Sequence, residues 1–182
     1  MSDSISNITV FNAGEILQQQ YREMVQLYDG AIREVRTKLE VLDNEFRVRY
    51  ARNPIHHIDS RLKSPASIME KLSRKGFPQT VDAAEANLTD IAGIRIVCNY
   101  LEDIYHIRKL LLHQRDVELV RERDYIKNPK DSGYRSLHLI VRIPVRVHNQ
   151  VYLIPAEIQL RTAPMDIWAS IEHELIYKPA QH

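Results

Sequence analysis

The chain has 182 residues, 44% of them hydrophobic and 27% charged, which is ordinary for a globular domain. This length suits one compact domain with a buried core, so we treat residues 1–182 as a single domain. The chain has no long uncharged apolar run, and its first residues lack the basic and apolar parts of a secretory signal, so neither a membrane span nor export is expected. Cys98 is the only cysteine, which excludes an intrachain disulfide and a cysteine-built metal site and favours a cytoplasmic location.

A long amphipathic helix is predicted first, over about residues 15–50. Apolar residues recur there at steps of three and four, as in a helix that buries one face. Gly30 lies inside this pattern and predicts an interruption of the helix. Asn53-Pro54 ends it, because the residue before a proline disfavours helical backbone. The catalytic core is then expected over about residues 53–178.

The remaining elements alternate between strands and helices. A short extended piece at 58–63 leads to a helix with Ser64 as its cap and Pro65 in its first turn, and this helix ends near Gly76. The patterns then predict strands at 94–98, 117–121, 136–143 and 151–160, helices at 101–113 and 164–177, and a loop at 127–133. The last helix carries on one face Ile167, Trp168, Ile171 and Leu175. This order predicts an α/β (α+β) fold, a mixed sheet flanked by helices.

The net charge of +1 is unevenly spread along the chain. Basic residues outnumber acidic ones over residues 61–75 and again over 121–146. Two such excesses in a nearly neutral chain suggest sites for polyanions, although charged faces that contact only solvent are a common alternative.

The first basic segment could form a phosphate site. Arg61 and Lys63 point to one face of a strand, and Ser67 and Lys71 share a face of the next helix. The free N–H groups at the start of that helix, which favour a phosphate, lie between the two pairs. Together they predict a triphosphate cradle. The alternative is a capped helix with solvated lysines.

Two polar side chains accompany the strand at 94–98. Asp90 lies at the strand entrance, where a carboxylate can hold Mg²⁺ while the metal keeps several waters. Arg95 points opposite to Ile94 and Ile96, so its planar guanidinium could stack on a nucleobase. The alternative is an ion pair between Asp90 and Arg95 at a sheet edge.

The strand at 136–143 and the loop before it carry an aromatic residue and a histidine. Tyr134 directly follows Gly133 at the junction of loop and strand, where an aromatic ring can stack on a base. His138 shares a strand face with Ser136 and could contact phosphates. The alternative is a histidine with satisfied hydrogen bonds at a sheet edge.

The strand at 151–160 alternates apolar and polar residues, which places Glu157, Gln159 and Arg161 together on its polar face. Glu157 could complete a magnesium site with Asp90, or take a proton from an attacking hydroxyl. The alternative is the solvent face of an edge strand, which Pro155 would favour.

These four groups, in this order, resemble the synthetase domain of the RelA/SpoT family, in particular the small alarmone synthetases. The resemblance covers about residues 53–178 and implies a nucleotidyltransferase-like fold. It also implies a GTP/GDP 3′-pyrophosphokinase of the stringent response. Such an enzyme transfers the β,γ-pyrophosphate of ATP to the 3′-hydroxyl of GDP or GTP, which makes ppGpp or pppGpp and releases AMP.

By matched position, the resemblance implies a role for each candidate residue. ATP is bound at its adenine by Arg61 and Arg95, and at its phosphates by Lys63, Ser67 and Lys71. Asp90 and Glu157 are the catalytic carboxylates that bind Mg²⁺, and Glu157 is also the candidate base. The acceptor's phosphates are held by Arg123, Lys130 and His138, while Tyr134 stacks on guanine and Gln159 orders the site. Asp166 accepts hydrogen bonds from guanine, which would reject adenine.

Further details bear on the subtype. The run Arg-Glu-Arg-Asp at 121–124 resembles the basic loop of the Mg²⁺-dependent bifunctional and small enzymes. His56, His57 and Asp59 could suggest a metal-dependent hydrolase, but the helical segment before them supplies no further ligands, so synthesis without hydrolysis is expected.

Small synthetases commonly continue beyond this chain's last residues with helices that build a tetramer. A homo-oligomer, an RNA contact and regulation by an alarmone therefore stay open, as does the preference for GDP or GTP.

Two other functions are compatible with these residues. A toxic relative in the same family transfers pyrophosphate to the 3′ end of tRNA, and the basic segments would suit that polyanion. A non-catalytic RNA-binding module on the same fold is the second alternative, because a fold alone does not decide function.

Overall fold

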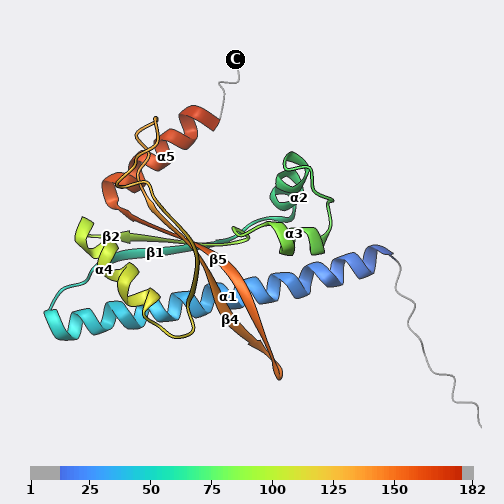
Figure 1. Cartoon of the computed structure of the whole chain (residues 1–182), viewed down its shortest axis with the longest axis horizontal. Helices are drawn as coiled ribbons and strands as arrows, with labels where there is room; N and C mark the ends of the chain where they lie inside the picture. The colour runs from blue at the N-terminus through green and yellow to red at the C-terminus, as the bar shows by residue number, and fades with distance from the viewer. Residues whose placement is uncertain (1–12, 178–182) are drawn as a thin grey trace, which may run out of the picture.

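The computed structural model describes residues 13–177 of the chain (Figure 1). Its elements, in chain order, are α1 (Ala13–Tyr50), β1 (Ile55–Leu62), α2 (Pro65–Arg74), α3 (Val81–Asn87), β2 (Ala92–Cys98), α4 (Leu101–Leu112), β3 (Glu118–Asp124), β4 (Leu137–Val147), β5 (Gln150–Thr162) and α5 (Ala163–Tyr177). None of the helices within these residues is long and apolar enough to cross a membrane.

The strands form one five-stranded sheet in the order β1-β2-β5-β4-β3. Only β2 and β5 run parallel; the other neighbours are antiparallel. This confirms the predicted mixed sheet flanked by helices. The interpretation of β5 as an edge strand is wrong, because β5 is the central strand. Pro155 is tolerated there because the pairing with β2 begins only at Ala156, so its missing N–H leaves that ladder intact.

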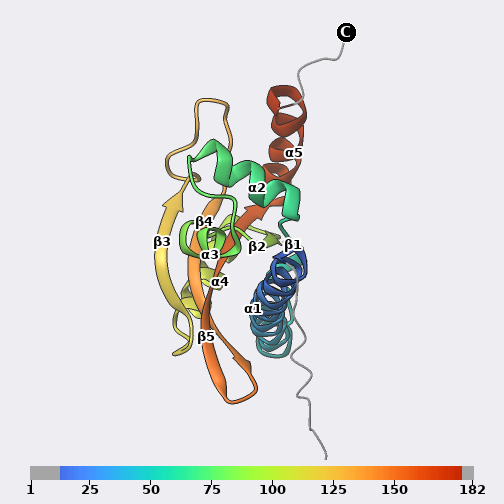
Figure 2. The ribbon, with the colours of Figure 1, turned by 90° about the vertical axis from the view of Figure 1, so that its right-hand side faces the viewer.

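One face of the sheet forms the hydrophobic core with α1 and α4. Val35 and Leu39 of α1 and Ile104 and Ile107 of α4 are fully buried. They pack in one cluster with inward-facing strand residues such as Ile158. Figure 2 shows α1 along one side of the sheet and β3 at the edge farthest from it. The opposite face of the sheet is therefore free of these two helices.

Helix α1 is continuous through Gly30, so the predicted interruption is wrong. A Cβ atom at Gly30 would lie 2.7 Å from Cγ1 of Val145 in β4. The glycine therefore allows the helix to approach the sheet closely, and it breaks neither the hydrogen-bond ladder nor the helix axis.

The helix starts follow ordinary capping chemistry. The predicted cap of α2 is confirmed: the Ser67 N–H donates to Ser64 Oγ at 3.3 Å. The short helix α3 was not predicted from the sequence. Its cap is Thr80, whose Oγ1 accepts from the Ala83 N–H at 3.2 Å. Seven residues are too few for a helical period to show.

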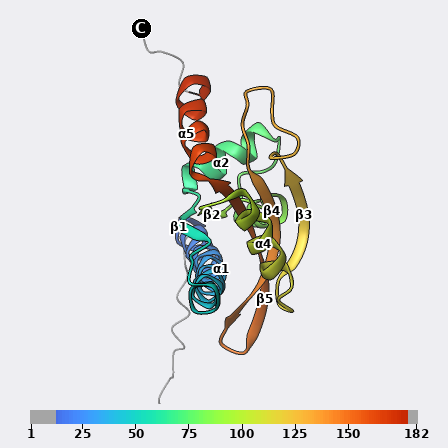
Figure 3. The ribbon, with the colours of Figure 1, turned by 90° about the vertical axis from the view of Figure 1, so that its left-hand side faces the viewer.

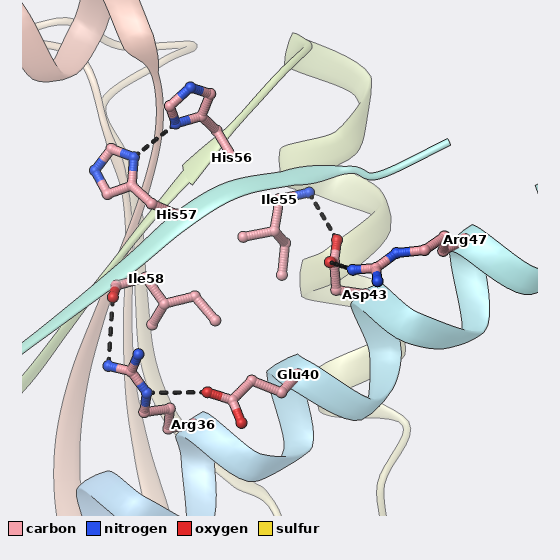
Figure 4. Close-up of a pocket in the computed structure, with 8 residues that line it drawn as sticks. All are labelled: Arg36, Glu40, Asp43, Arg47, Ile55, His56, His57 and Ile58. Carbon is pink, nitrogen blue, oxygen red and sulfur yellow. Dashed lines mark hydrogen bonds and ion pairs between the residues drawn. The ribbon is translucent and has the colours of Figure 1, made fainter. Parts of the chain in front are cut away.

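A hollow of about 210 Å³ lies between α1 and the edge strand β1 (Figure 4). On one side of it, Arg36 donates to the Ile58 carbonyl at 3.4 Å. On the other, Asp43 Oδ1 accepts from the Ile55 N–H at 3.1 Å. Helix α1 thus supplies partners for backbone groups of an edge strand, which protects that edge from pairing with another chain.

Candidate active site

The register of the strands places the candidate residues in two rows across one face of the sheet. The first row runs through Asp59, Arg95, Gln159, His138 and Arg123. The second row runs through Arg61, Gly93, Glu157, Ile140 and Arg121. Members of the two rows are two residues apart on each strand, so they share a face, and it is the face opposite the core with α1 and α4.

The order of the strands gives the site two halves. The predicted ATP-binding residues Arg61 and Arg95 lie on β1 and β2, at one edge. The predicted acceptor residues Arg123 and His138 lie on β3 and β4, at the other. Glu157 lies on the central strand β5 between the two halves. The run at 121–124 belongs to strand β3 and is not a loop.

Asp90 connects the two lysines of the predicted phosphate cradle. Its Oδ2 lies 2.5 Å from Lys71 Nζ and 3.1 Å from Lys63 Nζ. Its Oδ1 is buried and has no hydrogen-bond partner among the described residues. Burial alone would raise the pKa of Asp90, but the hydrogen bond from Lys71 and the charge of Lys63 outweigh it and hold this pKa below its ordinary value. Ser67 makes a separate contact, because its Oγ accepts from Ser64 Oγ at 2.9 Å.

Arg95 does not pair with Asp90, so that alternative is wrong. Its Nη2 donates to Asp59 at 2.7 Å, and its Nε lies 3.4 Å from Asp166 Oδ1. The guanidinium is thus held between β1 and the start of α5, on the polar face of the sheet, as its alternation with buried neighbours predicts.

Glu157 is a half-buried carboxylate in contact with His138. Its Oε1 lies 3.4 Å from His138 Nδ1, and its Oε2 accepts from Gln159 Nε2 at 3.3 Å. Burial would raise the pKa of Glu157, as does the negative charge of Asp90, but the hydrogen bond and charge of His138 hold it below its ordinary value. The interpretation of His138 as an edge residue is wrong, because β4 lies between β5 and β3.

The acceptor residues gather around two tyrosines. Tyr134 is only 7% exposed, with its hydroxyl 2.8 Å from His138 Nε2. Lys130 Nζ lies 4.6 Å from the centre of the Tyr134 ring and 5.1 Å from that of Tyr125. Arg123 donates to the Tyr125 hydroxyl at 3.3 Å. Four of the predicted acceptor residues thus meet in one place, but Lys130 covers the ring that was expected to stack on guanine.

Comparison with known proteins identifies the family. The family described as the region found in RelA / SpoT proteins matches residues 60–182. The chain belongs to the RelA/SpoT family. It is 39% identical over 172 residues to the GTP pyrophosphokinase YwaC of Bacillus subtilis, an alignment that spans 94% of this chain and 82% of that protein.

Solved structures of small alarmone synthetases have the same fold. Small alarmone synthetase 2 of Bacillus subtilis is 43% identical, with a TM-score of 0.75 over 84% of this chain and 78% of that one. Small alarmone synthetase 1 of the same organism, bound to its product pppGpp, is 36% identical, with a TM-score of 0.79 over 87% of this chain and 80% of that one.

Two residues of this candidate site were not assigned a role from the sequence. Arg161 is buried, and its Nη2 donates to the Tyr134 hydroxyl and to Gln159 Oε1, each at 2.7 Å. Tyr125 contacts Arg123 and Lys130. Alternation along β5 placed Arg161 on the correct face, but its partners come from distant segments. No local pattern marks Tyr125.

Helix α5 anchors the loop that carries Lys130 and Tyr134. Trp168 Nε1 donates to the Ser132 carbonyl at 3.0 Å, and Ser132 Oγ donates to Glu172. All four apolar members of the predicted face of α5, Ile167, Trp168, Ile171 and Leu175, are exposed. Figure 3 shows α5 extending beyond the end of the sheet.

The histidines of β1 lie outside the two rows. Nδ1 of His56 lies 2.8 Å from Nδ1 of His57 (Figure 4). Nε2 of His57 is 3.5 Å from Asp59 Oδ2. Among the described side chains, at residues 16–175, no group of three or more His, Cys, Asp or Glu could hold a metal ion. Synthesis without hydrolysis stays a prediction.

Proposed function

We propose that this chain is an ATP-dependent pyrophosphokinase that makes ppGpp from GDP and pppGpp from GTP, releasing AMP, in the cytoplasm. One observation carries the proposal: Glu157 lies on the central strand, with candidate donor residues on β1 and β2 and candidate acceptor residues on β3 and β4. The name of YwaC and the pppGpp bound to a solved relative support the same reaction.

The donor half binds ATP. Arg61 and Arg95 hold the adenine, and Lys63, Ser67 and Lys71 hold the phosphates. The Arg61 side chain lies over Gly93, where an added Cβ would come within 3.5 Å of its Cγ. Glycine at this position therefore leaves room for Arg61 above the sheet.

Asp90 and Glu157 would hold a divalent metal, which we propose to be Mg²⁺. Asp90 Oδ1 is a buried oxygen without a hydrogen-bond partner among the described residues, which is what a missing ligand leaves behind. The lowered pKa values keep both carboxylates ionised at neutral pH. Two protein oxygens suit Mg²⁺, whose remaining ligands are commonly waters and substrate phosphates. When bound, the ion offsets negative charge on the transferred group.

The protein contributes position and charge to the transfer. Lys63 and Lys71 offset the charge of the ATP phosphates. Tyr134 stacks on guanine after Lys130 leaves its ring, while Lys130, Arg123 and His138 hold the acceptor's phosphates and Gln159 orders the site. The 3′-oxygen attacks the β-phosphorus, and the bond from that phosphorus to the oxygen shared with the α-phosphate breaks. AMP leaves with that oxygen, and Glu157 takes the proton of the 3′-hydroxyl.

Glu157→Gln tests this function. The amide cannot accept the proton and is a poor metal ligand, so synthesis of ppGpp from ATP and GDP should fall by at least about a thousandfold, the combined scale of general-base and electrostatic catalysis. Binding of a non-hydrolysable ATP analogue, measured by calorimetry without metal, should change by less than about threefold. Glu122→Gln is the matched control, because Glu122 pairs with Arg108 and is absent from both rows.

The acceptor is tested on the unmodified protein. With labelled ATP and either GDP or tRNA, label should appear on GDP. If label appeared on tRNA alone, the acceptor would be the 3′ end of tRNA and the assignment of a guanine nucleotide would be wrong. Binding of RNA with no turnover of ATP on either acceptor would instead support the non-catalytic alternative.

A further inference from the structure

Arg161 is the only basic residue that is buried in the part of the chain the structure describes, with 6% exposure. Its guanidinium contacts side chains from three segments of the chain. Nη2 donates to Tyr134 and Gln159, Nη1 donates to Asp166 Oδ1 at 3.1 Å, and Nε lies 3.4 Å from Ser136 Oγ. A planar group with five N–H donors in a fixed fork suits such an arrangement, since each partner must take a set position around it.

Two of these partners, the Tyr134 ring and the Asp166 carboxylate, are the groups that the resemblance to the small alarmone synthetases assigns to guanine. The hydroxyl of Tyr134 is fixed between Arg161 and His138, which orients the stacking ring. The contacts of Asp166 with Arg161 and Arg95 both end on Oδ1. Oδ2 of Asp166 is therefore the oxygen that can accept from another donor. The Asp166 side chain is 19% exposed, so a ligand can reach it.

We infer that Arg161 is a positioning residue that determines which base the acceptor site takes, because it sets the aim of the Asp166 carboxylate relative to the Tyr134 ring. Guanine presents N1–H and a 2-amino group, both of which can donate to a carboxylate. Hypoxanthine lacks the 2-amino group, and adenine has an acceptor at N1. A carboxylate misplaced by about an ångström would lose this distinction even though the ring could still stack.

This inference rests on the proposed function, and Arg161→Lys tests it. Lysine keeps the charge, but a single ammonium group cannot reach three segments at once. In the unmodified enzyme, kcat/KM for GDP should exceed that for IDP by about tenfold or more, as expected when a charged hydrogen bond is lost. In the Arg161→Lys enzyme this ratio should fall to about twofold or less, while binding of a non-hydrolysable ATP analogue stays within about threefold.

Arg108→Lys is the control for exchanging an arginine that makes an ion pair. Arg108 holds Glu122 at 2.7 Å and lies on α4, away from both rows, so its lysine variant should keep the GDP to IDP ratio of the unmodified enzyme. A role of Arg161 in stability alone would lower activity with GDP and IDP together and leave their ratio unchanged. That result would overturn the inference.

A second variant covers the case in which Arg161→Lys does not fold. Asp166→Glu changes a partly exposed residue in the first turn of α5 and keeps the charge, but its extra methylene moves the carboxylate relative to Arg161. The GDP to IDP ratio should fall as it does for Arg161→Lys, and an unchanged ratio would reject the inference. Failure of the proposed function is a separate result, because the unmodified protein would then make no product from ATP and GDP.

Discussion

Asp90 holds Lys63 and Lys71 together through contacts of its Oδ2 with both ammonium groups. All three side chains are at most 22% exposed, so each charge depends on the others for compensation. A triphosphate would compete with Asp90 for the lysines, and a metal ion would take the place of the lysines on Asp90. These ion pairs thus hold in position the same groups that the proposed reaction needs.

Asp90→Asn should destabilise the protein in a pH-dependent way. The pKa of Asp90 is lowered in the folded protein, so its contribution to stability is fully present above the ordinary carboxyl pKa of about 4 and is lost as the pH falls through the lowered value. Removing the charge leaves two poorly solvated lysines unpaired. We expect the free energy of unfolding in urea to fall by about 1–3 kcal/mol at pH 7, and this difference should shrink as the pH is lowered below the ordinary carboxyl pKa of about 4.

Asp29→Asn is the control for Asp90→Asn. Its ion pair with Arg33 joins exposed side chains within one helix, so its loss should change the free energy of unfolding by less than about 0.5 kcal/mol. A loss for Asp90→Asn that does not shrink as the pH is lowered from 7 to well below the ordinary carboxyl pKa of about 4 would contradict the assigned charge interaction.

Among the elements, α1 and β5 show what a sequence pattern predicts and what it omits. The apolar period located α1 almost completely, and alternation assigned each residue of β5 to its correct face. The position of β5 at the centre of the sheet was missed, because strand order depends on pairing between segments far apart in the chain. Gly30 was misread for the same reason: its partner, Val145, lies on β4.

Gly30→Ala should destabilise the protein, although alanine is the better helix former. The gain in helix propensity is about 1 kcal/mol, whereas a methyl group forced against Val145 costs about 1–3 kcal/mol. A net loss of up to about 2 kcal/mol is expected in chemical unfolding. In a Val145→Ala background the new methyl group has room, so the same change should be neutral or stabilising. Equal effects in both backgrounds would show that the two residues do not meet.

At the scale of the whole molecule, the site forms from segments that are distant in sequence. The resemblance assigned roles to residues on all five strands. The pattern of apolar and polar residues along the sequence does not predict strand register, so it did not show that these residues align in two rows. The contacts of Arg161 were missed because they join β5, the loop before β4 and α5, and those of Tyr125 because they join β3 to that loop and to β4. The contact of the Lys130 ammonium group with the face of the Tyr134 ring was missed because it depends on side-chain packing.

The two halves of the site should respond separately to substitution. Four strand spacings separate β1 from β3, roughly 19 Å, so Arg61 and Arg123 cannot contact the same part of one nucleotide. We expect Arg61→Ala to weaken binding of a non-hydrolysable ATP analogue by about tenfold, the scale of a lost stacking contact, and to change GDP binding by less than about twofold. Arg123→Ala should weaken binding of GDP by about tenfold or more and leave binding of the ATP analogue within about twofold. The reason is that a lost hydrogen bond from a charged group to a phosphate is worth about 1.5–3 kcal/mol.

Calorimetry with each nucleotide alone would measure both effects. Glu157→Gln, at the centre, should bind both nucleotides and turn over neither, which separates the chemical step from the two binding steps. If Arg61→Ala and Arg123→Ala weakened both nucleotides equally, the division of the sheet into a donor half and an acceptor half would be wrong. The two rows would then form one shared nucleotide pocket, and Glu157 would lie at its floor instead of at the boundary between two substrates.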